Sequence, residues 1–165
     1  MRVRDTARVL LLDPQGRILL MRGRLAGAPD GERFWFTVGG GVEPGETVEQ
    51  AAAREVLEET GIADARLGPV VWLREGVVPH METGEPLLFR ERYLVATSGG
   101  GEPDRSGWND LERRLVDAIR WWTLAEIAAS RERIYPEGLA GLLPEILAGQ
   151  YPEAPIWIGR PPTGA

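Results

Sequence analysis

The stretch GGGVEPGETVEQAAAREVLEETGI, which ends at Ile62, constrains this chain most, because a glycine-rich loop leads directly into a segment crowded with glutamates. The three glycines that open it allow the backbone to approach a ligand closely. Thr47 and Gln50 have the spacing of a capping box, in which each side chain satisfies a backbone amide at the start of a helix. Gly61 fits the position where a left-handed residue ends a helix. The sequence therefore predicts a loop followed by a helix over 47–60.

Three glutamates share one face of this predicted helix. At about 100° per residue, Glu55, Glu58 and Glu59 fall within roughly a hundred degrees of one another around the helix axis. Crowding like charges is unfavourable, and a divalent cation that prefers oxygen ligands would offset the repulsion. The plainer interpretation is a solvated acidic helix. The preceding glycines favour the cation, because backbone carbonyls there are available to complete its shell.

The same stretch resembles the Nudix box, the signature of the Nudix hydrolase family. That signature is a glycine, five residues, a glutamate, seven residues, and then Arg-Glu-aliphatic-any-Glu-Glu-any-Gly-aliphatic. Every spacing is intact here, and the matching residues are Gly40, Glu46, Arg54, Glu55, Val56, Glu58, Glu59, Gly61 and Ile62. A looser resemblance extends from about Val3 to about Leu147. It departs from the family at Val38, where many relatives have proline.

The resemblance implies an α+β fold, a Nudix-type α/β/α sandwich on a mixed β-sheet. It also implies an enzyme that uses Mg²⁺ or Mn²⁺ to hydrolyse a pyrophosphate bond. The substrate would be a nucleoside diphosphate linked to another group, such as ADP-ribose, a nucleotide sugar or a nucleoside triphosphate. By the same resemblance the metal ligands are Glu55, Glu58, Glu59 and the backbone carbonyl of Gly40 or of its neighbour Gly39. Arg54 would hold the glutamates by ion pairing, and Glu46 would orient the loop or bind metal through water.

Hydrolysis also needs a base that takes the proton of the attacking water. Glu55 or Glu58 is a candidate, and so is an acidic residue before Trp121, where some relatives keep the base. Glu102, Glu112 and Asp117 lie there, and we rank Glu112 first, although the plainer interpretation of Glu112 is a surface glutamate on a helical segment. The predicted catalytic residues are therefore Glu55, Glu58, Arg54 and Glu112.

The predicted substrate-binding residues are Arg22, Arg24, Glu46 and Glu91. Arg22 and Arg24 follow an apolar strand, and the guanidinium of an arginine matches the oxygens of a phosphate. The two arginines also fit as ordinary surface charges. Glu91 lies on an alternating strand and is expected to point toward the metal. Aromatic candidates for stacking on a base are Trp72, Trp108 and Phe89, whereas Trp35, Trp121 and Trp122 are expected in the core.

Apolar and β-branched runs predict strands over 9–13, 18–22, 34–38, 67–78, 86–96 and 119–122. A turn containing Pro14 and Gly16 makes the first two a hairpin. A second capping box at Thr123 opens a short helix, and leucines at helical spacing predict a last helix that contains Pro144. Three loops, over 25–33, 79–85 and 97–108, are expected to set substrate specificity.

The composition narrows the alternatives. The 165 residues fit one domain, with a frayed tail from Arg160. The absence of cysteine excludes disulfides, thiolate metal sites and cysteine nucleophiles, and a net charge of −6 argues against a nonspecific nucleic-acid binder. No apolar run has the length of a signal peptide or a membrane span, so a cytoplasmic location is expected. The expected partner is a nucleotide-derived small molecule, and a homodimer is one assembly that the sequence leaves open.

The main competing hypothesis is a non-catalytic nucleotide sensor on the same fold. Such proteins usually lack one or more glutamates of the box, and none is missing here. An isopentenyl diphosphate isomerase shares the fold but uses a cysteine, which this chain does not have. A calcium-binding protein would show a loop of alternating Asp and Asn, and no such loop is present.

Overall fold

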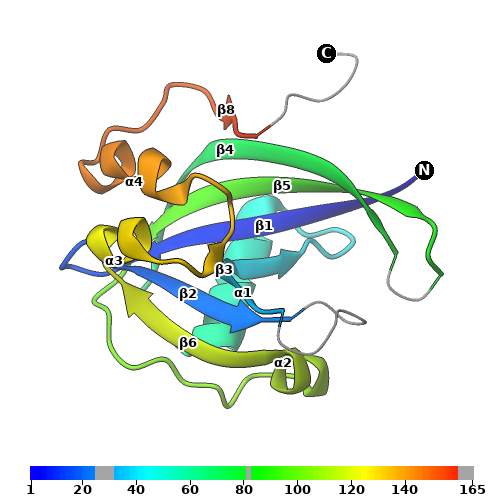
Figure 1. The fold of residues 1–165 in the computed structure, drawn as a ribbon, viewed down its shortest axis with the longest axis horizontal. Coiled ribbons are helices and arrows are strands. Elements are labelled where there is room, and N and C mark those ends of the chain that lie inside the picture. Colours follow the sequence, from blue (N-terminus) through cyan, green and yellow to red (C-terminus); the bar gives the residue numbers. More distant parts are fainter. Residues whose placement is uncertain (25–31, 81–82, 160–165) are drawn as a thin grey trace.

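The computed structural model describes residues 1–24, 32–80 and 83–159. Within these ranges the strands form one eight-stranded mixed sheet with helices on both faces (Figure 1), so the predicted α+β sandwich is confirmed. The strands are β1 (Arg2–Leu12), β2 (Ile18–Gly23), β3 (Phe34–Gly41), β4 (Arg66–Pro79), β5 (Pro86–Thr97), β6 (Val116–Trp122), β7 (Arg133–Ile134) and β8 (Ile156–Trp157). The helices are α1 (Val48–Thr60), α2 (Asp110–Leu115), α3 (Leu124–Ala129) and α4 (Leu139–Leu147). The tail expected to fray from Arg160, and most of the loop expected over 25–33, lie outside the described residues.

The strand order is β6-β2-β3-β1-β5-β4-β8, with β7 added beside β3. The central strand β1 runs antiparallel to β3 and parallel to β5, and its pairing with β5 extends from Arg2 opposite Leu87 to Leu12 opposite Thr97. β4 pairs with β5 in the antiparallel direction, and the short β8 joins the outer edge of β4 in parallel. No helix in the described ranges is both long and apolar enough to cross a membrane.

The predicted hairpin of β1 and β2 is only partly correct. The turn is present, since the Gly16 amide donates to the Asp13 carbonyl at 3.1 Å. The two strands, however, pair only where Leu12 faces Ile18. Beyond that point β3 lies between them, because the apolar residues of β2 also pair with β3 and β6.

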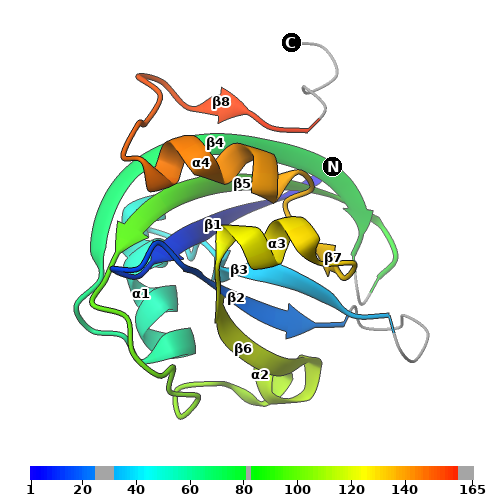
Figure 2. The ribbon, with the colours of Figure 1, turned by 60° about the vertical axis from the view of Figure 1, so that its left-hand side comes forward.

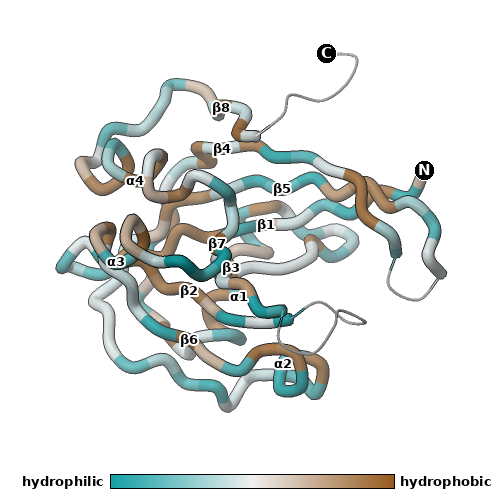
Figure 3. The backbone as a smooth tube through the Cα atoms, in the orientation of Figure 1, coloured by the Kyte–Doolittle hydropathy of each residue, from teal (hydrophilic) through white to brown (hydrophobic). Residues whose placement is uncertain are grey.

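Two apolar clusters hold the helices against the sheet. One contains Leu10, Trp72, Trp122 and the buried apolar residues of α3 and α4, and the other contains Val9, Leu11, Leu94 and the buried apolar residues of α1. Figure 2 shows α3 and α4 on one side of the strands and α1 on the other. The hydropathy colouring in Figure 3 shows the same pattern as brown stretches along β2 and α4. Because neighbouring residues of β1 point to opposite faces, this one strand contributes to both clusters.

Local signals fix both ends of α1. Thr47 and Gln50 form the predicted capping box, with the Gln50 amide donating to Thr47 Oγ1 at 3.1 Å. Gly61 ends the helix in the left-handed region at φ 70°, as predicted. Ala51, Ala52 and Val56 are fully buried, so this apolar stripe fixes which face of α1 meets the sheet.

The structure contains elements that the sequence analysis missed. α2 begins with a capping box at Asn109, and the two-residue strand β7 was not predicted. β1 starts at Arg2, seven residues earlier than the predicted strand. The last predicted helix is present as α4, and it continues through Pro144.

Candidate active site

A cavity of about 620 Å³ surrounds the glycine end of β3. A volume of this size suits a small organic ligand. Two groups of charged residues contribute to its lining, one acidic and one basic. The lining includes Arg4, Thr6, Arg8, Arg24, Phe34, Phe36, Thr37, Gly39, Gly40, Gly41, Glu55, Glu59, Arg74, Phe89, Glu91, Tyr93, Asn109, Glu112, Arg133 and Tyr135.

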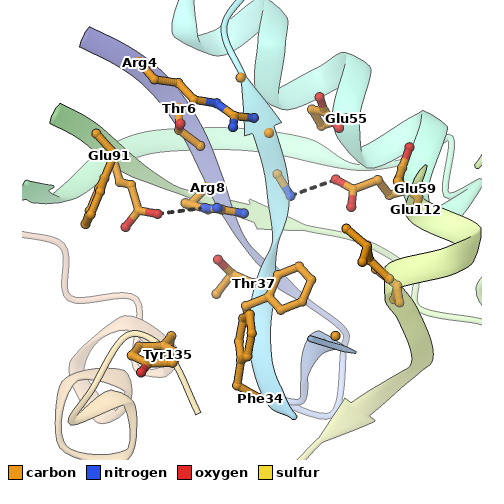
Figure 4. Close-up of a pocket in the computed structure, with 18 of the residues that line it drawn as sticks. Arg4, Thr6, Arg8, Phe34, Thr37, Glu55, Glu59, Glu91, Glu112 and Tyr135 are labelled. Atoms are coloured by element: carbon orange, nitrogen blue, oxygen red, sulfur yellow. Dashed lines mark hydrogen bonds and ion pairs between the residues drawn. The ribbon is translucent and has the colours of Figure 1, made fainter. Parts of the chain in front are cut away.

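The glycines of β3 let α1 approach the sheet closely. A Cβ atom on Gly40 would lie 2.4 Å from Oε1 of Glu55, so any side chain there would displace that carboxylate. Gly39 has a φ of 143°, and a Cβ on it would meet the carbonyl oxygen of Ala7 at 2.1 Å. The Gly39 amide donates to Oε1 of Glu59 at 2.9 Å, which Figure 4 draws as a dashed line. The glycine segment therefore brings the backbone of β3 into contact with two carboxylates.

Glu55 and Glu59 place two acidic groups side by side at this point. Glu59 is 4% exposed, although carboxylates are rarely buried without a partner. Burial raises the pKa of Glu59 well above its ordinary value, and the charge of Glu55 raises it further, while the Gly39 amide opposes both effects. The ionised pair is therefore unfavourable unless a proton or a cation compensates it.

Arg54 braces the acidic side of the site, as the resemblance implies. Its guanidinium binds Glu46 through two hydrogen bonds of 2.8 and 2.9 Å, and it donates to the Gly41 carbonyl at 3.0 Å. It also contacts Glu55 at 3.0 Å and Glu58 at 3.3 Å. Hydrogen bonding to Arg54 lowers the pKa of Glu46 to about 2, with help from the Glu43 backbone. The loop before α1 is thereby tied to the helix and to β3.

Glu58 occupies a different position from its two neighbours. Its side chain is 48% exposed, it pairs with Arg54, and it does not line the cavity. Glu55 and Glu59 do line it. Of the three glutamates that share a helical face, only two therefore point into the cavity.

Glu112 reaches the same cavity from α2. Oε1 accepts a long hydrogen bond of 3.4 Å from the Asn109 amide, within the capping box of this helix. Oε2 is buried and has no hydrogen-bond partner among the described residues. Burial raises the pKa of Glu112, the Asn109 amide opposes this, and the negative charges of Glu55 and Glu58 raise it further. An orphaned carboxylate oxygen thus lies close to the acidic pair.

Of the two predicted substrate-binding arginines, only one lies at the cavity. Arg24 lines the cavity. Arg22 does not, and it is held by Asp117 at 2.9 Å and by Glu132 at 3.6 Å. Its guanidinium also lies 5.5 Å from the ring centroid of Trp35, so its contacts on this edge of the sheet are structural.

Glu91 lines the cavity but does not join the acidic pair. Figure 4 shows it on the opposite side of β3 from Glu55 and Glu59. Its oxygens accept from Arg8 at 3.1 Å, from Arg74 at 2.8 Å and from the Tyr93 hydroxyl at 3.0 Å. Burial alone would raise the pKa of Glu91, but the two arginines and the tyrosine outweigh that effect and lower it. The structure therefore surrounds Glu91 with donors.

Of the aromatic candidates for stacking, only Phe89 lines the cavity. Trp72 and Trp108 are 2% and 6% exposed, and the Trp108 indole donates to the Glu59 carbonyl at 2.7 Å, so both belong to the packed interior. Trp35 and Trp122 are buried as expected, while Trp121 is half-buried. Sequence reasoning missed Phe34 and Tyr135, whose rings meet edge to face at a centroid distance of 5.6 Å in the lining.

Sequence reasoning also missed the basic residues of β1. Arg4, Thr6 and Arg8 alternate along the strand and all line the cavity. Asp5 lies between Arg4 and Thr6, so this segment does not alternate polar with apolar residues, and no strand signal marked it in the sequence.

The acidic side of the cavity fits a divalent cation in its chemistry. Two adjacent carboxylates, the glycine backbone and the orphaned Oε2 of Glu112 are all oxygen donors, which magnesium and manganese prefer. Across residues 1–24, 32–80 and 83–159, no three acidic or histidine side chains already converge closely enough to hold a metal on their own. A cation at this place would therefore draw part of its coordination from backbone, water or substrate.

Comparison with known proteins gives a family, two curated relatives and a solved structure. The family profile described as the NUDIX domain matches residues 2–142. The oxidized purine nucleoside triphosphate hydrolase of Danio rerio is 32% identical over 122 residues, spanning 70% of this chain and 75% of that protein. The RNA pyrophosphohydrolase of Wolbachia pipientis is 36% identical over 128 residues, spanning 74% and 75% respectively. The solved NUDIX hydrolase from Nitrosomonas europaea matches with a TM-score of 0.60 and 21% identity, over 91% of this chain and 92% of that one.

Proposed function

This chain belongs to the Nudix hydrolase family and is related to pyrophosphohydrolases, and on that premise we propose that it hydrolyses nucleoside diphosphate derivatives with Mg²⁺ or Mn²⁺. The bond cleaved is a pyrophosphate anhydride. The observation that carries the proposal is the pair of carboxylates on Glu55 and Glu59, packed against the glycine backbone of β3 inside a ligand-sized cavity.

We assign the main metal-binding roles to Glu55, Glu59 and the backbone of Gly40. A divalent cation held there supplies two effects, a lower pKa for bound water and neutralised charge on the phosphates. Glu58 is a ligand only if its side chain turns away from Arg54, which now holds it outside the cavity.

The remaining residues support this chemistry. Glu112 is our choice for the base that takes the proton of the attacking water, because its buried Oε2 has no partner within the described part of the chain and its pKa is raised. Arg54 on α1 binds Glu46 on the preceding loop, so these two residues position the loop relative to the helix and do not take part in the reaction. Arg24, at the cavity, is the better placed of the two predicted phosphate-binding arginines.

The first test is hydrolysis of a substrate panel with Mg²⁺, with Mn²⁺ and with chelator. The panel contains ADP-ribose, a nucleotide sugar, a nucleoside triphosphate and an RNA, and release of phosphate or nucleotide is measured. Metal-dependent turnover of one class establishes the reaction. Tight nucleotide binding with no turnover of any compound would instead support the non-catalytic sensor.

The second test is Glu59→Gln, compared with Glu49→Gln on the exposed side of the same helix. We expect kcat/KM to fall by about a hundredfold or more for Glu59→Gln, because loss of a ligand should cost at least as much as loss of an outer-shell partner. The Glu49 control should keep wild-type activity. Equal activity in all three proteins would remove Glu59 from the metal site.

The cytoplasmic location, the single domain over residues 1–165 and the homodimer stay predictions. Size-exclusion chromatography with light scattering measures the assembly directly, and a monomeric mass at micromolar concentration would contradict the homodimer.

A further inference from the structure

The cavity has a second charged wall that the proposed chemistry does not use. Arg4, Thr6 and Arg8 of β1 point to the same side of the strand, and we call them the donor row. β1 lies beside the glycines of β3, with Thr6 opposite Gly41 and Arg8 opposite Gly39. Figure 4 shows the donor row on one side of β3 and the carboxylates of α1 on the other.

The donor row has unused hydrogen-bonding capacity. Arg8 donates to Glu91 only through Nε, so the terminal nitrogens of its guanidinium have no protein acceptor among the described residues. Over the same ranges, the Arg4 guanidinium and the Thr6 hydroxyl have no hydrogen bond or ion pair. Arg4 is exposed, no side-chain atom of Thr6 or Arg8 is both fully buried and unpartnered, and all three residues line the cavity.

The wall also carries more positive charge than the protein neutralises. Glu91 is the acidic residue of this wall, and both of its oxygens are occupied, by Arg8 on one and by Arg74 and Tyr93 on the other. Two arginines therefore share one carboxylate, and Arg4 adds a third positive charge to the cavity lining. The side chains of Arg8 and Arg74 are only 23% and 28% exposed, so solvent compensates them incompletely.

We propose that the donor row is a phosphate-binding subsite, which takes a phosphate of the substrate other than the two joined by the bond that is cleaved. A fixed guanidinium with two free terminal nitrogens matches two phosphate oxygens, and a hydroxyl and a second arginine supply further donors. Glu91 and Arg74 are positioning residues, because Glu91 accepts from Arg8 Nε and Arg74 holds the other oxygen of Glu91. The place of this subsite in a substrate rests on the proposed function, but its affinity for phosphate does not.

A nucleobase edge is the competing ligand, since a guanidinium also binds the acceptor edge of guanine. The excess of arginines favours the anion, because a neutral base leaves the positive charge uncompensated. Stacking surfaces for a base are available elsewhere in the cavity, on Phe34 and Tyr135.

The test is calorimetric binding of inorganic tripolyphosphate in metal-free buffer of low ionic strength. Arg8→Met should weaken binding by about tenfold or more, since a charged hydrogen bond contributes that much. Arg4→Met should weaken it in the same direction. The matched control is Arg90→Met, which removes an arginine that pairs with Asp5 and is absent from the cavity lining. Circular dichroism and thermal unfolding check that each variant is folded.

Unchanged tripolyphosphate affinity in folded Arg8→Met and Arg4→Met would overturn the subsite. If Arg8→Met loses guanosine binding but keeps tripolyphosphate binding, the phosphate subsite is also overturned, and Arg8 instead binds the edge of a base. If the wild type hydrolyses nothing but its tripolyphosphate binding depends on Arg8, the subsite stands and the proposed function fails. If the wild type shows metal-dependent hydrolysis but its tripolyphosphate affinity does not depend on Arg8 or Arg4, the proposed function stands and the subsite fails.

Substrates then distinguish the two sources of the extra phosphate. For Arg8→Met, kcat/KM is compared on a nucleoside triphosphate, on ADP-ribose and on ADP-ribose carrying a 2′-phosphate. A loss confined to the triphosphate places the group in the phosphate chain, and a loss confined to the 2′-phosphate compound places it on the sugar. An equal loss on all three, ADP-ribose included, would contradict an extra phosphate.

Discussion

At the scale of single residues, Glu112 shows how one side chain combines two tasks. Its Oε1 closes the capping box of α2, which fixes the side chain, while Oε2 stays buried without a partner in the described structure. Burial raises the pKa of Glu112, and Glu55 and Glu58 add to that shift against the opposing Asn109 amide. A carboxylate with a raised pKa is a stronger base once it is ionised.

Glu112→Gln therefore tests the base directly. The glutamine keeps the capping interaction but cannot take a proton, so kcat should fall by about a hundredfold or more. In the wild type, kcat should fall as the pH drops through the raised pKa of Glu112, because protonation removes the base. The variant should lose this acidic limb of the kcat profile. A variant with wild-type kcat and an unchanged limb would assign the base to another residue.

At the scale of elements, the site depends on how closely α1 approaches β3. Gly40 is the point of contact, and its φ is not in the left-handed region, so alanine is allowed there by backbone geometry. The added Cβ would meet Oε1 of Glu55 at 2.4 Å, which is the far end of a flexible side chain. The carboxylate can rotate away with little change in the fold.

Gly40→Ala should therefore separate activity from stability. We expect kcat/KM to fall by about a hundredfold, as displacement of a reacting group by about 1 Å commonly does, while the free energy of unfolding changes by less than about 1 kcal/mol. Gly141→Ala is the control, since a Cβ there meets nothing within 4 Å and alanine favours a helix by about 0.5–1 kcal/mol. Steady-state kinetics and urea unfolding measure both quantities. Parallel losses of activity and stability in Gly40→Ala would show that the glycine serves the fold.

At the scale of the whole molecule, the sheet separates two chemical environments around one cavity. α1 supplies carboxylates on one side of β3, and β1 and β4 supply arginines on the other. The acidic side is costly for the folded protein, because a raised pKa for Glu59 means that ionising it disfavours the native state. The native state is therefore more stable when Glu59 is protonated. This stabilisation is lost as the pH rises from the ordinary glutamate pKa through the raised pKa of Glu59.

Divalent cations should reverse this cost and stabilise the fold. At a Mg²⁺ concentration of about 100 Kd, linkage gives about 2.7 kcal/mol, which raises the melting temperature of a chain this size by roughly 5–10 °C. Removal of the metal with chelator should return it to the lower value. Glu59→Gln should melt at or above the metal-free wild type and respond weakly to Mg²⁺, as differential scanning fluorimetry can show. An equal Mg²⁺ response in both proteins would place the cation elsewhere.

The sequence by itself determined the parts that local interactions control. The caps of α1, the glycines before it and the spacing of its glutamates all lie within one short stretch, so their consequences follow from neighbouring residues. The family follows from the same spacing. The strands built from apolar runs were also predictable, because their side chains must be buried wherever the strands pair.

Only the tertiary structure decided which charged residues face the cavity. The helical wheel places Glu58 and Glu59 on one face, but packing of α1 against β3 buries Glu59 and leaves Glu58 half exposed. The polar start of β1 became a strand because β3 and β5 pair with it across long sequence separations. Glu91 lies among arginines for the same reason. Such contacts depend on strand order, which periodicity and capping do not encode, so the donor row was visible only in the folded molecule.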